Sequence, residues 1–271
     1  MSPKDSFLFS HWSTEPEGSN AFDFSTTIDK DTTLYAVIKN QKTISFDSNG
    51  GTPVNNSYVD NGSLADNLGS LPEPTRQGYE FKGRVDTKTG QLVDETVEVT
   101  RDYKPEAQWE AKTDTPYTVV HWIENPTGQC EVNGIQYTVG TITEESGTTD
   151  STATYTKPGF FSAYTLSNYQ PEVGIVKIDG DGQATLNVYY ERRKYNLTVD
   201  NFGDVAVYQV KWGEPLTQYL DNKGVPSWSM YNSDRPGGSL LARNNYPMPA
   251  MDTTVRAASR VFFCSPYHVL H

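Results

Sequence analysis

The feature of this 271-residue sequence that most constrains its fold is an internal repeat. Residues 7–38 and residues 79–109 carry aromatics, turn residues and an Asp-led ending in the same order. The matched positions are Phe9 with Phe81, Asp31 with Asp102, and Ala36 with Ala107. Such a repeat predicts several small modules, each built on one pattern, rather than one large core.

A third copy of this half-repeat runs from Pro226 to Ala257. Trp228 is expected at the position of Phe81, and Pro236-Gly237-Gly238 is expected to form the turn. The stretch Asp252–Ala257 repeats the pattern of Asp31–Ala36.

A shared first half precedes the second and third copies. Ile44 and Phe46, like Leu197 and Val199, alternate with polar residues and are expected to face a core before Asn-Gly type turns reverse the chain. Short helices are predicted at residues 62–68, capped by Ser63, and at residues 213–220, with Pro215 in the first turn. Each complete unit is therefore predicted as strand, strand, short helix, strand, strand.

These patterns predict a mostly β (α+β) chain of tandem, small, β-grasp-like modules, elongated overall. Residues 1–40 are expected to form a partial repeat that has only its second half, and residues 41–112 a full repeat. Residues 113–194 are expected to form a different β module, residues 195–259 a divergent repeat, and residues 260–271 a tail. Residues 1–40 are expected either to fray or to lean on the next module. Short polar linkers are expected near Lys39–Lys42, Ala111–Pro116 and Arg192–Lys194.

The stretch FDSNGGTPVNNSYVDNGSLADNLGSLPEPTRQGYEFKGRVDTKTG resembles the internalin B-repeat family, also called the Listeria-Bacteroides repeat. The resemblance covers residues 7–109 and, more loosely, residues 195–259. It implies a β-grasp-like fold, tandem placement in long bacterial surface proteins, and a spacer or adhesion role without catalytic residues. The Gly-Trp pair usual in the family corresponds here to His11-Trp12, Gly83-Arg84 and Met230-Tyr231, which calls into question any role of that aromatic in the second copy.

Residues 117–190 differ from the other modules. They open with YTVVHWIEN and close with GIVKIDGDGQATLNVYYERRKY, which is similar to the mucin-binding-protein type of repeat in surface proteins of Gram-positive bacteria. This resemblance implies binding of host or neighbouring-cell glycans.

The charge and the apolar pattern narrow the classes of partner. The formal net charge of −12 repels phosphate backbones, so no nucleic-acid partner is expected. No run of about 18 apolar residues and no N-terminal signal pattern occurs, so we expect no direct membrane insertion, with any signal and anchor outside this sequence. Cys130 and Cys264 are expected to be unpaired thiols. The expected setting is the bacterial cell surface, as an extracellular monomer.

No catalytic or metal motif stands out, and no cofactor is expected. Asp179-Gly180-Asp181-Gly182 resembles the start of a calcium loop, but its twelfth position is Tyr190 instead of an acidic residue, so a hairpin turn is predicted. The four histidines lack zinc spacing, and neither a nucleophile elbow nor a phosphate-binding loop is present.

Aromatic residues concentrate in the third module and could stack on sugar rings. The candidate ligand-binding set is Trp122, Tyr155, Phe160, Phe161, Tyr164 and Tyr169. Small modules also need large side chains for their cores. The leading hypothesis is a stalk that projects other domains. The alternatives are an adhesin that binds host glycans or extracellular proteins through residues 113–194, and an accessory region of a surface-anchored enzyme. A contiguous exposed aromatic patch would favour adhesion, and buried aromatics would favour the spacer.

Overall fold

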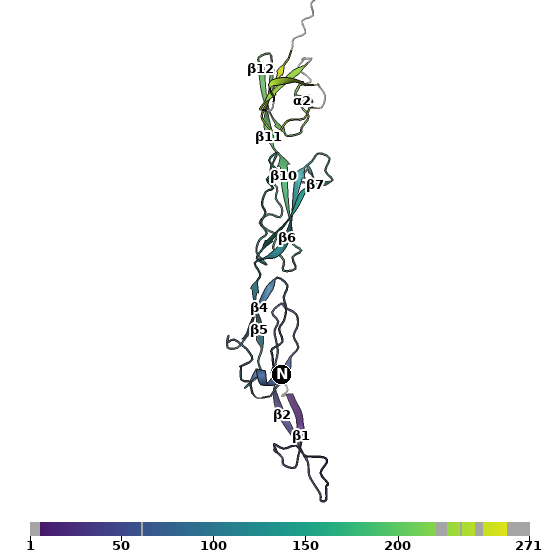
Figure 1. Ribbon diagram of the computed structural model, residues 1–271, viewed down its shortest axis with the longest axis vertical. Coiled ribbons are helices and arrows are strands. Elements are labelled where there is room, and N and C mark those ends of the chain that lie inside the picture. Colours follow the sequence, from purple (N-terminus) through teal and green to yellow (C-terminus); the bar gives the residue numbers. More distant parts are fainter. Residues whose placement is uncertain (1–5, 61, 221–226, 234, 242–245, 259–271) are drawn as a thin grey trace, which may run out of the picture. The chain divides into compact units, whose positions relative to one another are not determined.

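The computed structural model describes residues 6–258, except residues 61, 221–226, 234 and 242–245 (Figure 1). The chain is mostly β, as predicted, with two short helices among the described residues. It divides into two compact units. The first comprises residues 1–117, 146–152 and 177–184, and the second comprises residues 118–145, 153–176 and 185–271.

The first unit holds the N-terminal hairpin and the second repeat. Its elements are β1 (Ser6–Ser13), β2 (Tyr35–Ile44), β3 (Ser57–Val59), α1 (Leu64–Leu68), β4 (Tyr79–Asp86) and β5 (Pro105–Ala111). Strands β1, β2 and β3 form one sheet, and β4 pairs with β5 in another. Parallel bridges from Ile44 to Tyr103 and from Asp47 to Glu106 place the segment that follows β2 beside β5.

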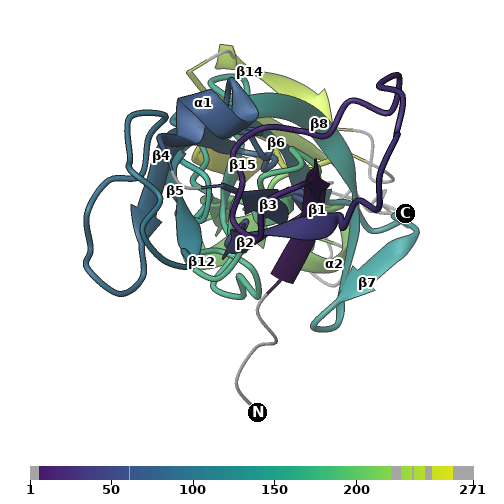
Figure 2. The ribbon, with the colours of Figure 1, turned by 90° about the horizontal axis from the view of Figure 1, so that it is seen from below.

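The core of the second repeat follows from its alternating pattern. Ile44 and Phe46 are buried, as predicted, and pack with Val59 and Leu64. Ser63 begins α1 (Figure 2) with a capping box, in which its hydroxyl accepts a bond from the Asp66 amide and its own amide donates to the Asp66 carboxylate. Asn49 and Gly50 both have positive φ and reverse the chain after the first strand.

The second unit holds most of the third module and the divergent repeat. Its elements are β6 (Thr115–Glu124, whose first residues belong to the first unit), β7 (Cys130–Val132), β8 (Ile135–Gly147), β9 (Tyr164–Leu166), β10 (Thr185–Arg192), β11 (Lys194–Asn201), β12 (Asp204–Lys211), α2 (Thr217–Leu220), β13 (Trp228–Asn232), β14 (Arg235–Leu241) and β15 (Thr253–Ala257). One sheet has the order β7-β8-β6-β10-β9 and the other has the order β12-β11-β15-β13-β14.

The second repeat has the predicted strand, strand, helix, strand, strand order, whereas the divergent repeat has one more strand, β14, between β13 and β15. Both repeats share one mixed arrangement. In the divergent repeat the first strand, β11, pairs antiparallel with β12 and parallel with the last strand, β15. In the second repeat the chain at Ile44 likewise lies between β3 and the last strand, β5. Leu197 and Val199 are buried in the divergent repeat, as predicted. This arrangement is the one expected of β-grasp-like modules.

The repeated aspartates have the same structural role in both full repeats. The Asp102 carboxylate accepts a hydrogen bond of 2.8 Å from the Thr43 amide, and the Asp252 carboxylate accepts one of 2.8 Å from the Asn196 amide. In each case the aspartate lies close to the start of the last strand. Its carboxylate accepts from the amide of the residue just before the first buried residue of the first strand. The Asp-led ending therefore fixes the register of the parallel pair.

The register corrects the predicted position of Trp228. Trp228 pairs with Ala257, just as Arg84 pairs with Ala107, so Trp228 corresponds to Arg84 and not to Phe81. A bulge between Phe81 and Gly83 shifts β4 by one residue just before Arg84, and the equivalent place before Trp228 lies outside the described residues. The divergent repeat therefore keeps an aromatic where the second repeat has arginine.

Three local predictions were wrong in whole or in part. Pro236-Gly237-Gly238 lies in β14 instead of a turn, because the chain reverses earlier, between Asn232 and Arg235. The chain does turn at residues 179–182, where the Gly182 amide donates to the Asp179 carbonyl at 3.0 Å, but the flanking arms do not pair as a hairpin, because Lys177 bridges Thr152. Pro215 precedes α2, where it bridges Pro247. The tail at residues 260–271, with Cys264, lies outside the described residues.

The expected linkers are largely replaced by strands. Lys39–Lys42 lies inside β2, which runs from the first half-repeat into the second repeat. Only residues 112–114 separate β5 from β6, and only Arg193 separates β10 from β11. The N-terminal hairpin thus leans on the next module through a shared strand, one of the two outcomes expected for residues 1–40.

Candidate functional site: the module junctions

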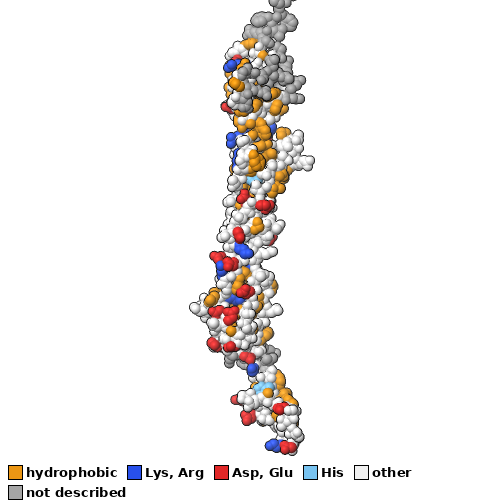
Figure 3. Space-filling model, viewed as in Figure 1, with side chains coloured by type: hydrophobic (Ala, Val, Ile, Leu, Met, Phe, Trp, Pro, Cys, Tyr) orange, Lys and Arg blue, Asp and Glu red, His pale blue; other side chains and the backbone are white. Residues whose placement is uncertain are grey.

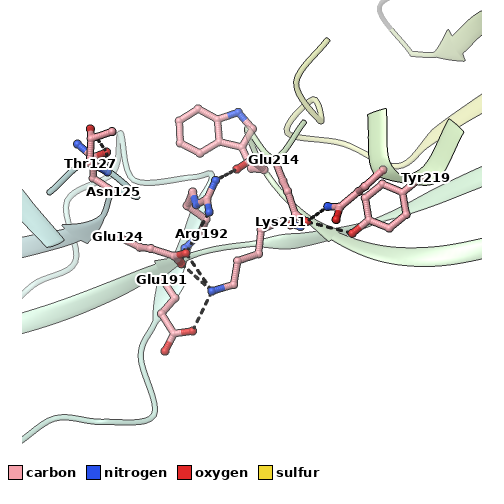
Figure 4. Close-up of polar contacts among 10 residues, drawn as sticks. Glu124, Asn125, Thr127, Glu191, Arg192, Lys211, Glu214 and Tyr219 are labelled. Atoms are coloured by element: carbon pink, nitrogen blue, oxygen red, sulfur yellow. Dashed lines mark hydrogen bonds and ion pairs between the residues drawn. The ribbon is translucent and has the colours of Figure 1, made fainter. Parts of the chain in front are cut away.

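The junction between the third module and the divergent repeat is built around Glu124. Glu124 ends β6, and parallel pairing of β6 with β10 brings Arg192 beside it. The Glu124 carboxylate accepts bonds from the Arg192 amide at 3.0 Å, from the Arg192 guanidinium at 3.1 Å, and from the Lys211 ammonium at 2.9 Å (Figure 4). Lys211 ends β12, so one carboxylate ties the third module to the divergent repeat.

These charges are withdrawn from solvent. The side chains of Glu124, Arg192 and Lys211 are 8%, 14% and 23% exposed. Burial by itself raises the pKa of Glu124, but the hydrogen bonds and charges of Lys211 and Arg192 outweigh it and hold the pKa below its ordinary value. Glu191, whose carboxylate lies 3.7 Å from the Lys211 ammonium, adds a second anion. Two cations thus face two carboxylates.

Backbone and ring contacts close the same junction. The Arg192 guanidinium donates to the Trp212 carbonyl at 3.0 Å, and the Trp212 amide donates to the Arg193 carbonyl at 2.8 Å. The rings of Trp212 and Tyr164 meet edge-on at 5.3 Å. Arg193, the single residue between β10 and β11, is therefore fixed by its own bond to Trp212 and by the bond from its neighbour Arg192 to the same residue.

A second junction, in the first unit, joins the second repeat to the base of the third module. The Thr149 hydroxyl donates to the Gly78 carbonyl at 2.8 Å and lies 2.7 Å from the Thr115 hydroxyl. The Thr149 amide donates to the Lys112 carbonyl at 2.9 Å. Tyr79 also donates to Asp150, and this bond raises the pKa of the Tyr79 hydroxyl.

Glycines allow the two backbones to approach at this second junction. A Cβ on Gly180 would lie 2.2 Å from the Gln77 carbonyl oxygen, and a Cβ on Gly78 would lie 2.3 Å from the Gly180 Cα. Only residues without side chains fit at this contact.

The predicted aromatic set does not form one patch. Phe161 is buried, and its ring lies 5.3 Å from that of Tyr190 and 6.2 Å from that of His121. Tyr164 packs between Phe161 and the junction residue Trp212. Phe160 and Tyr169 are exposed, and Tyr155 is half-buried. Phe161 and Tyr164 thus serve packing, and the exposed ring of Phe160 lies 4.8 Å from that of Phe161.

Trp122 lies on the other face of the sheet, in a shallow groove. Its ring stacks on Tyr189 at 6.3 Å, and its indole N–H donates to Asn187 at 2.7 Å. The groove has a volume of about 410 Å³ and is lined by Trp122, Thr127, Gly128, Gln129, Cys130, Tyr137, Thr138 and Val139. Cys130 is a free thiol.

His121 is part of the core. It is fully buried, its imidazole nitrogens lie 3.2 Å from the Tyr190 and Thr143 hydroxyls, and burial lowers its pKa. Across the described residues, no group of three or more His, Cys, Asp or Glu side chains is placed to hold a metal ion. No helix in the described ranges is long and apolar enough to cross a membrane.

Sequence reasoning missed Glu124, Arg192 and Lys211 as functional residues. The available signal was an acidic residue at the end of one strand and a basic run, Arg192–Lys194, at the end of another. That signal becomes informative only once β6 and β10 are known to pair in parallel.

Comparison with known proteins supports part of this architecture. No curated protein matches the chain. Residues 3–37 and 43–102 match the model of the Listeria-Bacteroides repeat domain, and these stretches cover the N-terminal hairpin and most of the second repeat. These two stretches are therefore similar to the Listeria-Bacteroides repeat domain.

Proposed function

We propose that the chain is a non-catalytic stalk segment of a bacterial cell-surface protein, located outside the cell, that projects or presents other domains. The matched repeat supports this setting, since repeats of this family occur in bacterial surface proteins. The observation that carries the proposal is the junction at Glu124. A spacer must transmit position from one module to the next, and buried ion pairs with a one-residue connection limit bending there.

A distance measurement across this junction tests the proposal. Spin labels at Val139→Cys in β8 and Val205→Cys in β12, both exposed positions, would report on the two modules when Cys130 and Cys264 are replaced by Ser. The expected distance distribution is narrow and broadens in Glu124→Gln. A broad distribution in the parent chain would contradict a stalk with a stiff junction.

A second candidate function, adhesion to host glycans or extracellular proteins, is favoured by the groove at Trp122. Aromatic faces beside polar side chains are suited to sugar rings. Saturable binding of the full chain on an array of mucin-type glycans and matrix proteins, lost in Trp122→Ala but kept in Phe160→Ala, would support this function. Phe160→Ala is the matched control because Phe160 is 71% exposed and lies outside the groove.

A further inference from the structure

The N-terminal hairpin is, in register, the second half of a complete repeat. Phe9 pairs with Ile38 and Trp12 with Ala36, just as Phe81 pairs with Trp109 and Arg84 with Ala107. Both hairpins also carry a bulge at the same place, between Phe9 and His11 and between Phe81 and Gly83. The two hairpins are therefore directly comparable residue by residue.

Equivalent residues of the two hairpins differ in burial. Ala107 is fully buried and Arg84 is 3% exposed, because residues 43–71 cover that face of β4–β5. Ala36 is exposed, Trp12 is 41% exposed and Ile38 is 57% exposed. Figure 3 shows hydrophobic side chains at the surface of this part of the chain. Exposed apolar faces of this kind are typical of interaction surfaces.

The edge of the hairpin is open as well. In the sheet order β1-β2-β3, β3 pairs only with Lys42–Ile44, so no described strand lies beside residues 35–41 on the side away from β1. Asp31, the equivalent of Asp102, is exposed next to this edge. In the second repeat the same edge receives a parallel strand whose first amide binds the aspartate.

We propose that the β1–β2 hairpin is an acceptor for a strand–strand–helix half-repeat with the chemistry of residues 43–71, supplied by another polypeptide segment. The occupant is defined by what covers the equivalent hairpin in this chain. It is an extended strand with apolar residues two apart, as at Ile44 and Phe46, whose preceding amide binds Asp31, followed by an antiparallel strand and a short helix. This inference does not depend on the stalk proposal.

Titration of a peptide of residues 41–78 into the full chain tests the acceptor. We expect saturable one-to-one binding that weakens at least tenfold in Ala36→Glu, because the new carboxylate would be buried without a partner. Tyr35→Glu is the matched control, since Tyr35 points to the opposite face and its equivalent in the second repeat is Glu106. A peptide with Ile44→Asp and Phe46→Asp should not bind. Binding that is equal in Ala36→Glu and Tyr35→Glu would overturn the proposal.

A covalent graft decides the matter if the free peptide does not bind. Phe7 holds the register position of Tyr79, so residues 41–78 can be placed directly ahead of Phe7 with the native connection length. The expected result is about tenfold slower hydrogen exchange at residues 35–38 than in the ungrafted chain, and loss of that protection when Ala36→Glu is added. Unchanged hydrogen exchange in the graft would overturn the proposal. Self-association of the ungrafted chain that is abolished by Ala36→Glu would also overturn it, because a second copy of the chain would then occupy this face.

Discussion

At the scale of single residues, Glu124 is the side chain on which the junction between the third module and the divergent repeat depends. Glu124→Gln removes the charge but keeps the shape, so Arg192 loses its paired carboxylate and Lys211 keeps Glu191 at 3.7 Å. We expect a loss of about 2 kcal/mol in the free energy of unfolding of the second unit, below the roughly 3–5 kcal/mol of a fully buried pair because Lys211 is partly exposed. Urea unfolding measures the loss. Glu80→Gln, which breaks an exposed pair with Lys82, should cost far less because water screens that pair, and equal losses would contradict the central role of Glu124.

The depressed pKa of Glu124 gives the same junction a pH dependence. A carboxyl group whose pKa is lowered by folding contributes stability above its unfolded value, near 4.3, and that contribution is lost as the pH falls through the folded value. The unfolding free energy of the second unit should therefore fall as the pH is lowered below about 5 and through the folded pKa of Glu124. The fall should be smaller in Glu124→Gln, and identical pH profiles for the two proteins would contradict this assignment.

The repeated aspartates allow a comparison within one chain. Asp102→Ala should destabilise the second repeat by about 1 kcal/mol, because the Thr43 amide loses its charged acceptor. Asp31→Ala should change stability little, since no described first strand lies beside Asp31. Thermal unfolding of both variants checks the difference. Equal destabilisation would mean that the aspartate acts within its own hairpin.

At the scale of elements, the contact between the second repeat and the base of the third module depends on close backbone approach. Gly180→Ala should force apart the loop at Gln77 and the turn at Gly180, because the added methyl group would lie 2.2 Å from a carbonyl oxygen. We expect faster proteolysis at residues 112–114 in this variant. Gly159→Ala is the control, since nothing lies within 4 Å of the position of its Cβ. Equal cleavage of the two variants would show that the contact does not form.

Alternation and turn chemistry predicted the local elements well. The buried strand positions at Ile44, Phe46, Leu197 and Val199 and the helix cap at Ser63 follow from short-range patterns, which the sequence displays directly. The register of β13 could not be predicted, because a bulge such as those between Phe9 and His11 and between Phe81 and Gly83 shifts a strand by one residue without a clear mark in the residue pattern.

The junction site was not predictable for a different reason. Glu124, Arg192 and Lys211 come from three strands far apart in sequence, and their meeting depends on which strands pair and in which direction. The surroundings of the aromatic set could not be predicted for a related reason. Phe161, which precedes β9, packs against Tyr190, whereas Trp122 in β6 stacks on Tyr189, on the other face of the sheet.

At the scale of the whole molecule, the proposed stalk requires that successive modules have little freedom to move relative to one another. Such a chain should be far more extended than a compact protein of its length, for which the radius of gyration would be about 18 Å, yet far from the roughly 58 Å of an unfolded chain. Inserting Gly-Ser-Gly-Ser after Arg193 should leave the secondary-structure content unchanged, while it adds flexibility at the junction between the third module and the divergent repeat.

Small-angle X-ray scattering of the full chain tests this central claim most directly. For the proposed stalk we expect a radius of gyration clearly above about 18 Å and a pair-distance distribution with the long tail of a rod. Neither should depend on protein concentration. A radius close to 18 Å with a symmetric pair-distance distribution would show that the modules collapse on one another, and would contradict the stalk.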